Sequence, residues 1–126
     1  MKSIFIILFI LINISHTGID CGQVKTGSFK LVSEESGTTI IIRTTDEQIE
    51  TNEYLNVRVK YNIHWLDECT YQLFDAEILS GDTSFKGSQT DTLTVKITEV
   101  TNSYYTAQLS SNFADFISEA KIEISN

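Results

Sequence analysis

A strict alternation of apolar and polar side chains, from Leu55 to Trp65, constrains the fold of this chain more than any other feature. The odd positions are all apolar and the even positions are all polar. A period of two belongs to the β-strand, where successive side chains point to opposite faces, whereas a helix repeats every 3.6 residues. The segment therefore predicts a long strand with one face in the core and the other in solvent.

Shorter segments of β character follow one another along the rest of the chain. Expected strands cover residues 27–32, 38–45, 46–52, 69–78, 92–100, 104–109 and 121–125. The uninterrupted run Ile40–Ile42 predicts a strand buried on both faces. A change of phase at Leu73–Phe74 predicts a β-bulge. Ser111 or Asn112 is a suitable N-cap for one short helix near residues 112–119.

These segments predict a mainly β domain. β-branched and aromatic residues are abundant and alanine is scarce, which favours strands over helices. The length of 126 residues suits a single domain. Seven or eight strands joined by short turns predict one antiparallel meander, strongly curved or partly closed into a barrel.

The N-terminus has the pattern of a secretory signal peptide. Lys2 precedes an apolar run over residues 4–14 that only Asn13 interrupts, and the run is too short to span a bilayer. Ser15 and Thr17 fit the small residues needed at positions −3 and −1 of a cleavage site after Thr17. We therefore expect residues 1–20 to be a signal peptide and short tail, and residues 21–126 to form the β domain, without a transmembrane helix. A periplasmic or extracellular location follows, with a single membrane anchor as the alternative.

Cys21 and Cys69 both lie in the expected exported part. An even number of cysteines in an oxidising compartment favours a disulfide over free thiols. Their separation matches neither a zinc site nor a CxxC redox motif. Lipid attachment to Cys21 is an alternative, although Ile19 and Asp20 stand where a bacterial lipoprotein signal needs a small residue.

Charge excludes some classes of partner. The formal net charge is −8, so the chain lacks the basic footprint that nucleic acids or an anionic membrane surface require. One basic row stands out on the polar face of the long strand, and a neighbouring strand could add Arg43. The row consists of Arg58, Lys60 and His64. It is a candidate anion-binding face, unless these cations pair with acids such as Glu47 or Glu50 on adjacent strands.

The sequence predicts no enzyme, cofactor or metal site. His64 could act as a general base if an acid oriented it, but a histidine on a polar strand face is ordinarily a surface residue. No serine-hydrolase or metalloprotease motif occurs. The acids around the long loop, residues 80–89, lack the spacing of a calcium-binding loop.

Three short patterns carry a family resemblance. They are Cys21-x-x-x-Lys25-Thr26-Gly27-x-Phe29, Arg43-Thr44-x-x-x-Gln48-Ile49-Glu50 and Trp65-x-x-x-Cys69-x-Tyr71. Their order resembles that of small exported proteins of Bacteroidota bacteria, which are often lipoproteins. The resemblance implies an exported β domain of unassigned function and supports the pairing of Cys21 with Cys69. It brings no catalytic residues.

Together these observations favour a non-enzymatic exported module that binds a partner protein or a small apolar ligand, because the mouths of small barrels are common pockets. A structural or assembly component of the cell envelope, which would recruit its partner through exposed strand edges, is the second hypothesis. An enzyme centred on His64 is the third. The oligomeric state and the identity of the ligand stay open.

Overall fold

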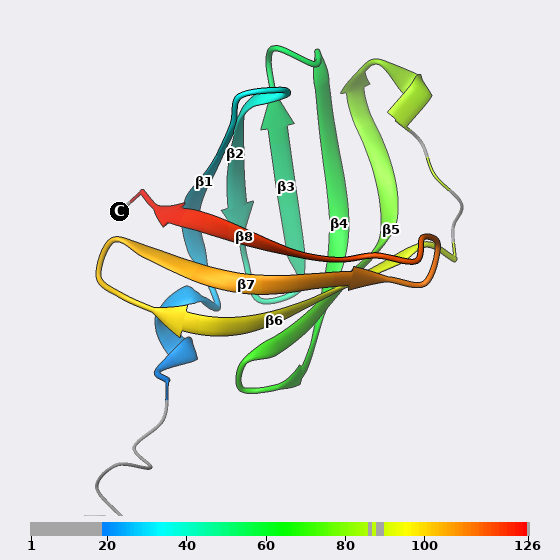
Figure 1. Ribbon diagram of the computed structural model, residues 1–126. Helices are drawn as coiled ribbons and strands as arrows, with labels where there is room; N and C mark the ends of the chain where they lie inside the picture. The colour runs from blue at the N-terminus through cyan, green and yellow to red at the C-terminus, as the bar shows by residue number, and fades with distance from the viewer. Residues whose placement is uncertain (1–18, 86, 88–89, 126) are drawn as a thin grey trace, which may run out of the picture.

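The computed structural model describes residues 19–85, 87 and 90–125, so nearly all of the expected signal peptide lies outside the described residues. Within them the chain forms one antiparallel meander that closes into a barrel, as Figure 1 shows. The strands are β1 (Gly27–Ser33), β2 (Gly37–Arg43), β3 (Glu47–Asn52), β4 (Val57–Asp67), β5 (Thr70–Gly81), β6 (Thr92–Val100), β7 (Tyr104–Ser111) and β8 (Ile117–Ile124). The predicted mainly β meander is confirmed, and the barrel is closed.

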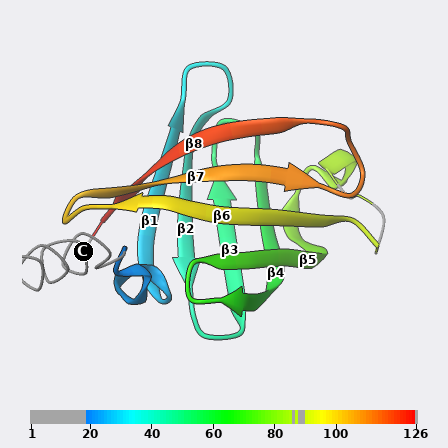
Figure 2. The ribbon, with the colours of Figure 1, turned by 60° about the horizontal axis from the view of Figure 1, so that its bottom comes forward.

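Pairing between the first and last strands completes the barrel. Phe29 of β1 lies opposite Ile124 of β8, and the Ser125 amide donates to the Ser28 carbonyl at 2.9 Å. Strands β1 to β5 stand side by side, while β6 to β8 cross them at a steep angle (Figures 1 and 2). Each described strand has a paired neighbour on both sides, but the pairing of β5 with β6 covers only residues 70–74, so residues 75–81 of β5 are paired with β4 alone.

The alternation that predicted the long strand appears in β4. Val59 and Ile63 are buried inside the barrel, whereas Arg58 and His64 are exposed outside it. Leu55 belongs to the turn that precedes the strand. The predicted two-faced strand is therefore confirmed from residue 57 onward.

A bulge in β5 follows immediately after the predicted position. Asn62 of β4 pairs with Phe74, but Lys60 pairs with Glu77, so Asp75 and Ala76 together oppose a single β4 residue. Asp75 has a φ of 52°. A bulge bends its strand. The residues of β5 before the bulge, 70–74, pair with β6 as well as with β4. The bulge thus marks the bend between the two sets of strands.

The expectation that the isoleucine run is buried on both faces is wrong. Ile41 is 4% exposed and points into the barrel, but Ile40 and Ile42 are 42% and 46% exposed on its outer surface. In the part of the chain that the structure describes, no second layer covers the outer surface of β2, so this strand buries only one of its faces.

The short helix expected near residues 112–119 is also wrong. Ser111 Oγ does accept the Ala114 amide at 3.1 Å, as an N-cap would, but the chain then enters β8 at Ile117. Ile117 pairs with Ser110 of β7. Strand pairing across the barrel outweighs the local capping signal.

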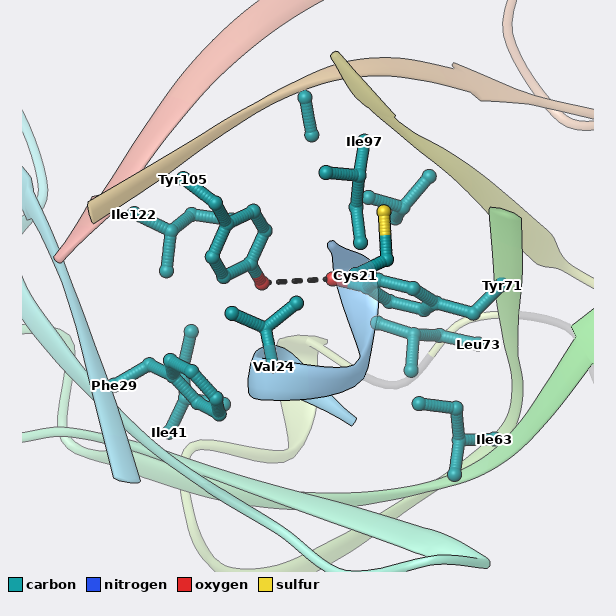
Figure 3. Packing of buried hydrophobic residues seen from close by; sticks show 12 residues of the cluster. Cys21, Val24, Phe29, Ile41, Ile63, Tyr71, Leu73, Ile97, Tyr105 and Ile122 are labelled. Atoms are coloured by element: carbon teal, nitrogen blue, oxygen red, sulfur yellow. Dashed lines mark hydrogen bonds between the residues drawn. The ribbon is translucent and has the colours of Figure 1, made fainter. Parts of the chain in front are cut away.

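The core fills the barrel and includes residues from nearly every element. It contains Cys21, Val24, Phe29, Ile41, Ile63, Tyr71, Leu73, Val95, Ile97, Tyr105, Ala107 and Ile122. Cys21 and Val24 come from a short 3-10 turn, η1 (Cys21–Val24), that precedes β1. Figure 3 shows η1 among the inward-pointing side chains of the strands. A second 3-10 turn, η2 (Thr83–Phe85), follows β5.

Candidate functional site

One end of the barrel is closed by η1, at the bottom of Figure 1. The predicted disulfide is confirmed: Cys21 and Cys69 are joined with a Cα–Cα distance of 5.4 Å. The bond attaches η1 to the turn between β4 and β5. Val24 is completely buried, and the Asp20 carboxylate caps η1 by accepting the Gly22 amide at 3.1 Å. The segment is a covalently attached plug.

Removing this disulfide should destabilise the barrel without abolishing its fold. The bond spans 48 positions, and closing a loop of that size contributes about 4 kcal/mol in the chain-entropy treatment. We expect Cys69→Ala to lower the free energy of unfolding by about 2–4 kcal/mol in urea titrations. The double variant Cys21→Ala/Cys69→Ala is the control and should lose the same amount. Unchanged stability in both variants would contradict a stabilising role for the bond.

Arg43 lies in the interior of the barrel and is 2% exposed. Its guanidinium donates four hydrogen bonds: Nη1 to the Val24 carbonyl (2.7 Å), Nε to Gln48 Oε1 (2.8 Å), and Nη2 to the hydroxyls of Tyr71 (3.0 Å) and Tyr105 (2.8 Å). The two tyrosine hydroxyls point toward each other, 3.0 Å apart (Figure 3). The expectation that Arg43 could join an outer basic face is therefore wrong.

Aromatic rings complete the surroundings of this guanidinium. Its Cζ lies 4.5 Å from the ring centroid of Phe29 and 4.6 Å from that of Tyr71. A cation held near aromatic rings gains cation–π attraction, which is larger where water is excluded. Since its hydrogen bonds go to the plug and to core side chains, Arg43 acts as an internal brace and not as a site for an external anion.

Strand β3 directs polar side chains into the barrel, where most of the other strands place apolar ones. Its inward positions carry Gln48, Glu50 and Asn52, while Ile49 lies between them on the other face. Gln48 passes the hydrogen-bond chain onward, because its Nε2 donates to Glu50 Oε2 at 2.7 Å. A polar path thus runs inside the barrel from the plug, through Arg43 and Gln48, to Glu50.

This path ends at a partly open cavity of about 170 Å³, here called the β3–β4 cavity. It is lined by Thr39, Glu50, Asn52, Leu55, Val57, Val59 and Tyr61. Leu55 comes from the β3–β4 turn, at the top of Figure 1 and so at the opposite end from the plug. A cavity of about 150 Å³ can hold a benzene-sized molecule.

Glu50 and Tyr61 each present an oxygen atom in the cavity that can still form a hydrogen bond. Glu50 uses one carboxylate oxygen for Gln48, and its other oxygen and the Tyr61 hydroxyl have no hydrogen-bond partner among the described residues. No side-chain nitrogen or oxygen in the described part of the chain is both buried and unpaired. The free oxygen of Glu50 and the Tyr61 hydroxyl therefore reach the accessible space of the cavity.

The environment of Glu50 disfavours its charge. Burial raises the pKa of the Glu50 carboxyl, while the hydrogen bond from Gln48 and the positive charge of Arg43 only partly oppose the rise. Burial also raises the pKa of Tyr61, and the negative charge of Glu50 raises that pKa further. Nearby cations and hydrogen-bond donors lower a carboxyl pKa, so a further donor in the cavity would stabilise the ionised form.

The predicted basic row lies on the outer face of β4. Lys60 Nζ is 3.4 Å from Glu47 and 3.9 Å from Glu77, so it pairs with acids of both neighbouring strands. Glu47 is one of the two acids that the sequence suggested as partners. The other one, Glu50, points into the barrel. The structure brings Arg58 and His64 to the same outer face, where both are exposed.

His64 has no hydrogen bond to a carboxylate among the described residues, and its cross-strand neighbour in β5 is Gln72. In the same part of the chain, no three His, Cys, Asp or Glu side chains gather as a metal site would require. None of the helices described is long and apolar enough to cross a membrane.

The sequence reasoning singled out neither Glu50 nor Tyr61 as a site residue. The signal in the sequence is the row of polar residues at alternate positions of β3, namely Gln48, Glu50 and Asn52. Comparison with protein-family models, with curated proteins and with solved structures finds no match for this chain.

Proposed function

We propose that this domain is a non-enzymatic binding module that holds a small amphipathic molecule in the β3–β4 cavity. The observation that carries the proposal is the composition of the cavity wall. Leu55, Val57 and Val59 form an apolar side, and Glu50 and Tyr61 offer polar atoms without partners. Ligand sites commonly combine an apolar wall with a few polar groups that fix orientation. An eight-stranded barrel is wide enough to hold one small ligand.

The proposal places the module outside the cytoplasm, in the periplasm or the extracellular medium. The apolar run over residues 4–14 supports export. The Cys21–Cys69 disulfide supports an oxidising compartment. The resemblance to exported Bacteroidota proteins points the same way.

The two other hypotheses receive less support. An assembly component that recruits a partner by strand addition needs a long free strand edge. Each described strand has two paired neighbours, and the part of β5 that is paired on one side only is the short, bulged segment of residues 75–81. An enzyme centred on His64 needs a group that orients the imidazole, and the exposed side chain has no carboxylate partner in the described structure.

Binding can be tested with three four-carbon probes: n-butanol, n-butylammonium and butyrate. We expect at least one of them to shift the backbone amide resonances of β3 and β4 around the cavity in ¹H–¹⁵N NMR titrations. Val57→Phe should abolish the shifts, because the larger ring occupies the cavity. Val32→Phe makes the same change on the exposed surface of β1 and should leave binding intact.

Two results would contradict the proposal. One is the absence of saturable shifts with all three probes. The other is unchanged probe binding by a folded Val57→Phe variant, which would place the bound probe elsewhere on the molecule.

A further inference from the structure

We propose that the β3–β4 cavity selects a small primary amine. The ammonium group would donate hydrogen bonds to the free oxygen of Glu50 and to the Tyr61 hydroxyl, and a short apolar chain would contact Leu55, Val57 and Val59. This inference rests on the proposed function and names the chemical class of its ligand.

The unpaired polar atoms of the lining are oxygens that can accept hydrogen bonds, and the hydroxyls of Tyr61 and Thr39 can donate as well. Asn52 has both of its amide donors occupied, because Nδ2 donates to the Ser36 carbonyl at 2.8 Å and to Thr39 Oγ1 at 3.1 Å. Its Oδ1 accepts the Leu55 amide at 2.9 Å. The remaining strong group is the unpaired oxygen of Glu50, an acceptor when ionised. An ammonium group brings three donors and no acceptor, which complements this set.

The charges in and near the cavity favour a cation over an anion. The lining contains no lysine, arginine or histidine. Arg43 is the nearest cation in the interior, but its guanidinium is bonded to Val24, Gln48, Tyr71 and Tyr105 and meets Glu50 only through Gln48. A carboxylate or phosphate ligand would face Glu50 without a compensating charge, and a buried charge without a partner is costly. An ammonium ligand would supply a counter-charge beside Glu50, whose charge Arg43 balances only in part.

The size of the cavity limits the rest of the ligand. A volume of about 170 Å³ suits a molecule of benzene size. The apolar part therefore has about four to six carbon atoms.

The test compares n-butylammonium with n-butanol, which has the same chain and no charge. In NMR titrations near neutral pH, the amine should bind about tenfold more tightly than the alcohol, as expected for a hydrogen bond to a charged partner. Glu50→Gln should remove this preference while n-butanol still binds. Glu77→Gln, the same substitution at an exposed glutamate, should leave the preference unchanged.

A second measurement on the unaltered protein does not depend on the folding of a variant. Amine binding should weaken as the pH falls through the pKa of Glu50, since the protonated acid no longer attracts a cation, whereas n-butanol binding should not change. The charged or titratable groups that face Glu50 are Arg43 of β2, Tyr61 of β4 and Tyr71 of β5. None of them titrates between about pH 4 and pH 8, because the arginine stays protonated and both tyrosines have raised pKa values.

Each outcome decides between the two proposals. If n-butanol or butyrate binds as tightly as the amine, the amine inference is wrong and the binding function stands. If Glu50→Gln keeps the preference, or if amine binding is independent of pH, the inference is also wrong. If no probe binds, both proposals fail.

Discussion

Replacing Arg43 by methionine is expected to lower the free energy of unfolding by about 3–5 kcal/mol, as measured by urea denaturation at neutral pH. The substitution keeps most of the side-chain volume but removes four donated hydrogen bonds. It leaves the Val24 carbonyl and Gln48 Oε1 without their donor, and it takes away the positive charge that partly balances Glu50. Buried polar groups that lose a partner carry the full desolvation penalty.

The loss should depend on pH and on Glu50. Burial already raises the pKa of Glu50, and Arg43 opposes the rise, so the pKa should increase further in the variant. A raised pKa in the folded state means that ionisation destabilises the fold. The deficit of Arg43→Met should therefore be largest well above that pKa and should shrink as the pH falls. Adding Glu50→Gln should recover part of the loss at neutral pH.

Lys60→Met is the matched control for Arg43→Met. Lys60 forms ion pairs with Glu47 and Glu77 on the barrel surface, with 30% of its side chain exposed. Surface ion pairs contribute at most about 1 kcal/mol, so this variant should be nearly as stable as the original protein. Similar losses in the two variants would contradict the bracing role of Arg43.

Replacing Ile63 by aspartate should unfold the barrel or lower its melting temperature by more than about 15 °C. Ile63 lies in the core on the inner face of β4. The guanidinium of the buried Arg43 already donates four hydrogen bonds to other groups, so an aspartate at this position would have no cation of its own to pair with. An unpaired buried charge costs several kcal/mol, a large part of the roughly 5–15 kcal/mol that stabilises a domain. Circular dichroism melts measure the effect.

His64→Asp, one residue along the same strand, provides the control. The His64 side chain is exposed on the outer face, so the melting temperature of the variant should stay within a few degrees of that of the unaltered protein. Equal melting temperatures for the Ile63 and His64 variants would mean that β4 does not separate a core face from a solvent face.

Much of the barrel could be predicted because its signals are local. The alternation over residues 57–65 specifies a strand and its inner face, and the pairing of β6 with β7 follows from two alternating segments around one short turn. A change of phase was enough to locate the bulge in β5 to within about two residues. The even cysteine count favoured the Cys21–Cys69 bond.

Other features depend on what a strand packs against. The run Ile40–Ile42 predicts burial on both faces, but only Ile41 meets the core, and none of the described residues form a layer over Ile40 and Ile42. Residues 112–119 begin with a helix-capping signal, but from Ile117 onward the backbone pairs with β7 as a strand. Both errors come from judging a segment without its neighbours.

The polar path inside the barrel best separates what the local sequence determines from what tertiary packing determines. Alternation along the chain is enough to make strands and to choose an inner face for most of them, because it depends only on backbone geometry and burial. It assigned Arg43 no place in the core, since an isolated arginine belongs in water. Only the closed barrel, which brings Val24, Gln48, Tyr71 and Tyr105 around that guanidinium, satisfies the charge inside. Glu50 and Tyr61 lie on the paired strands β3 and β4 and so meet locally, whereas the partners of Arg43 meet only after distant segments have packed.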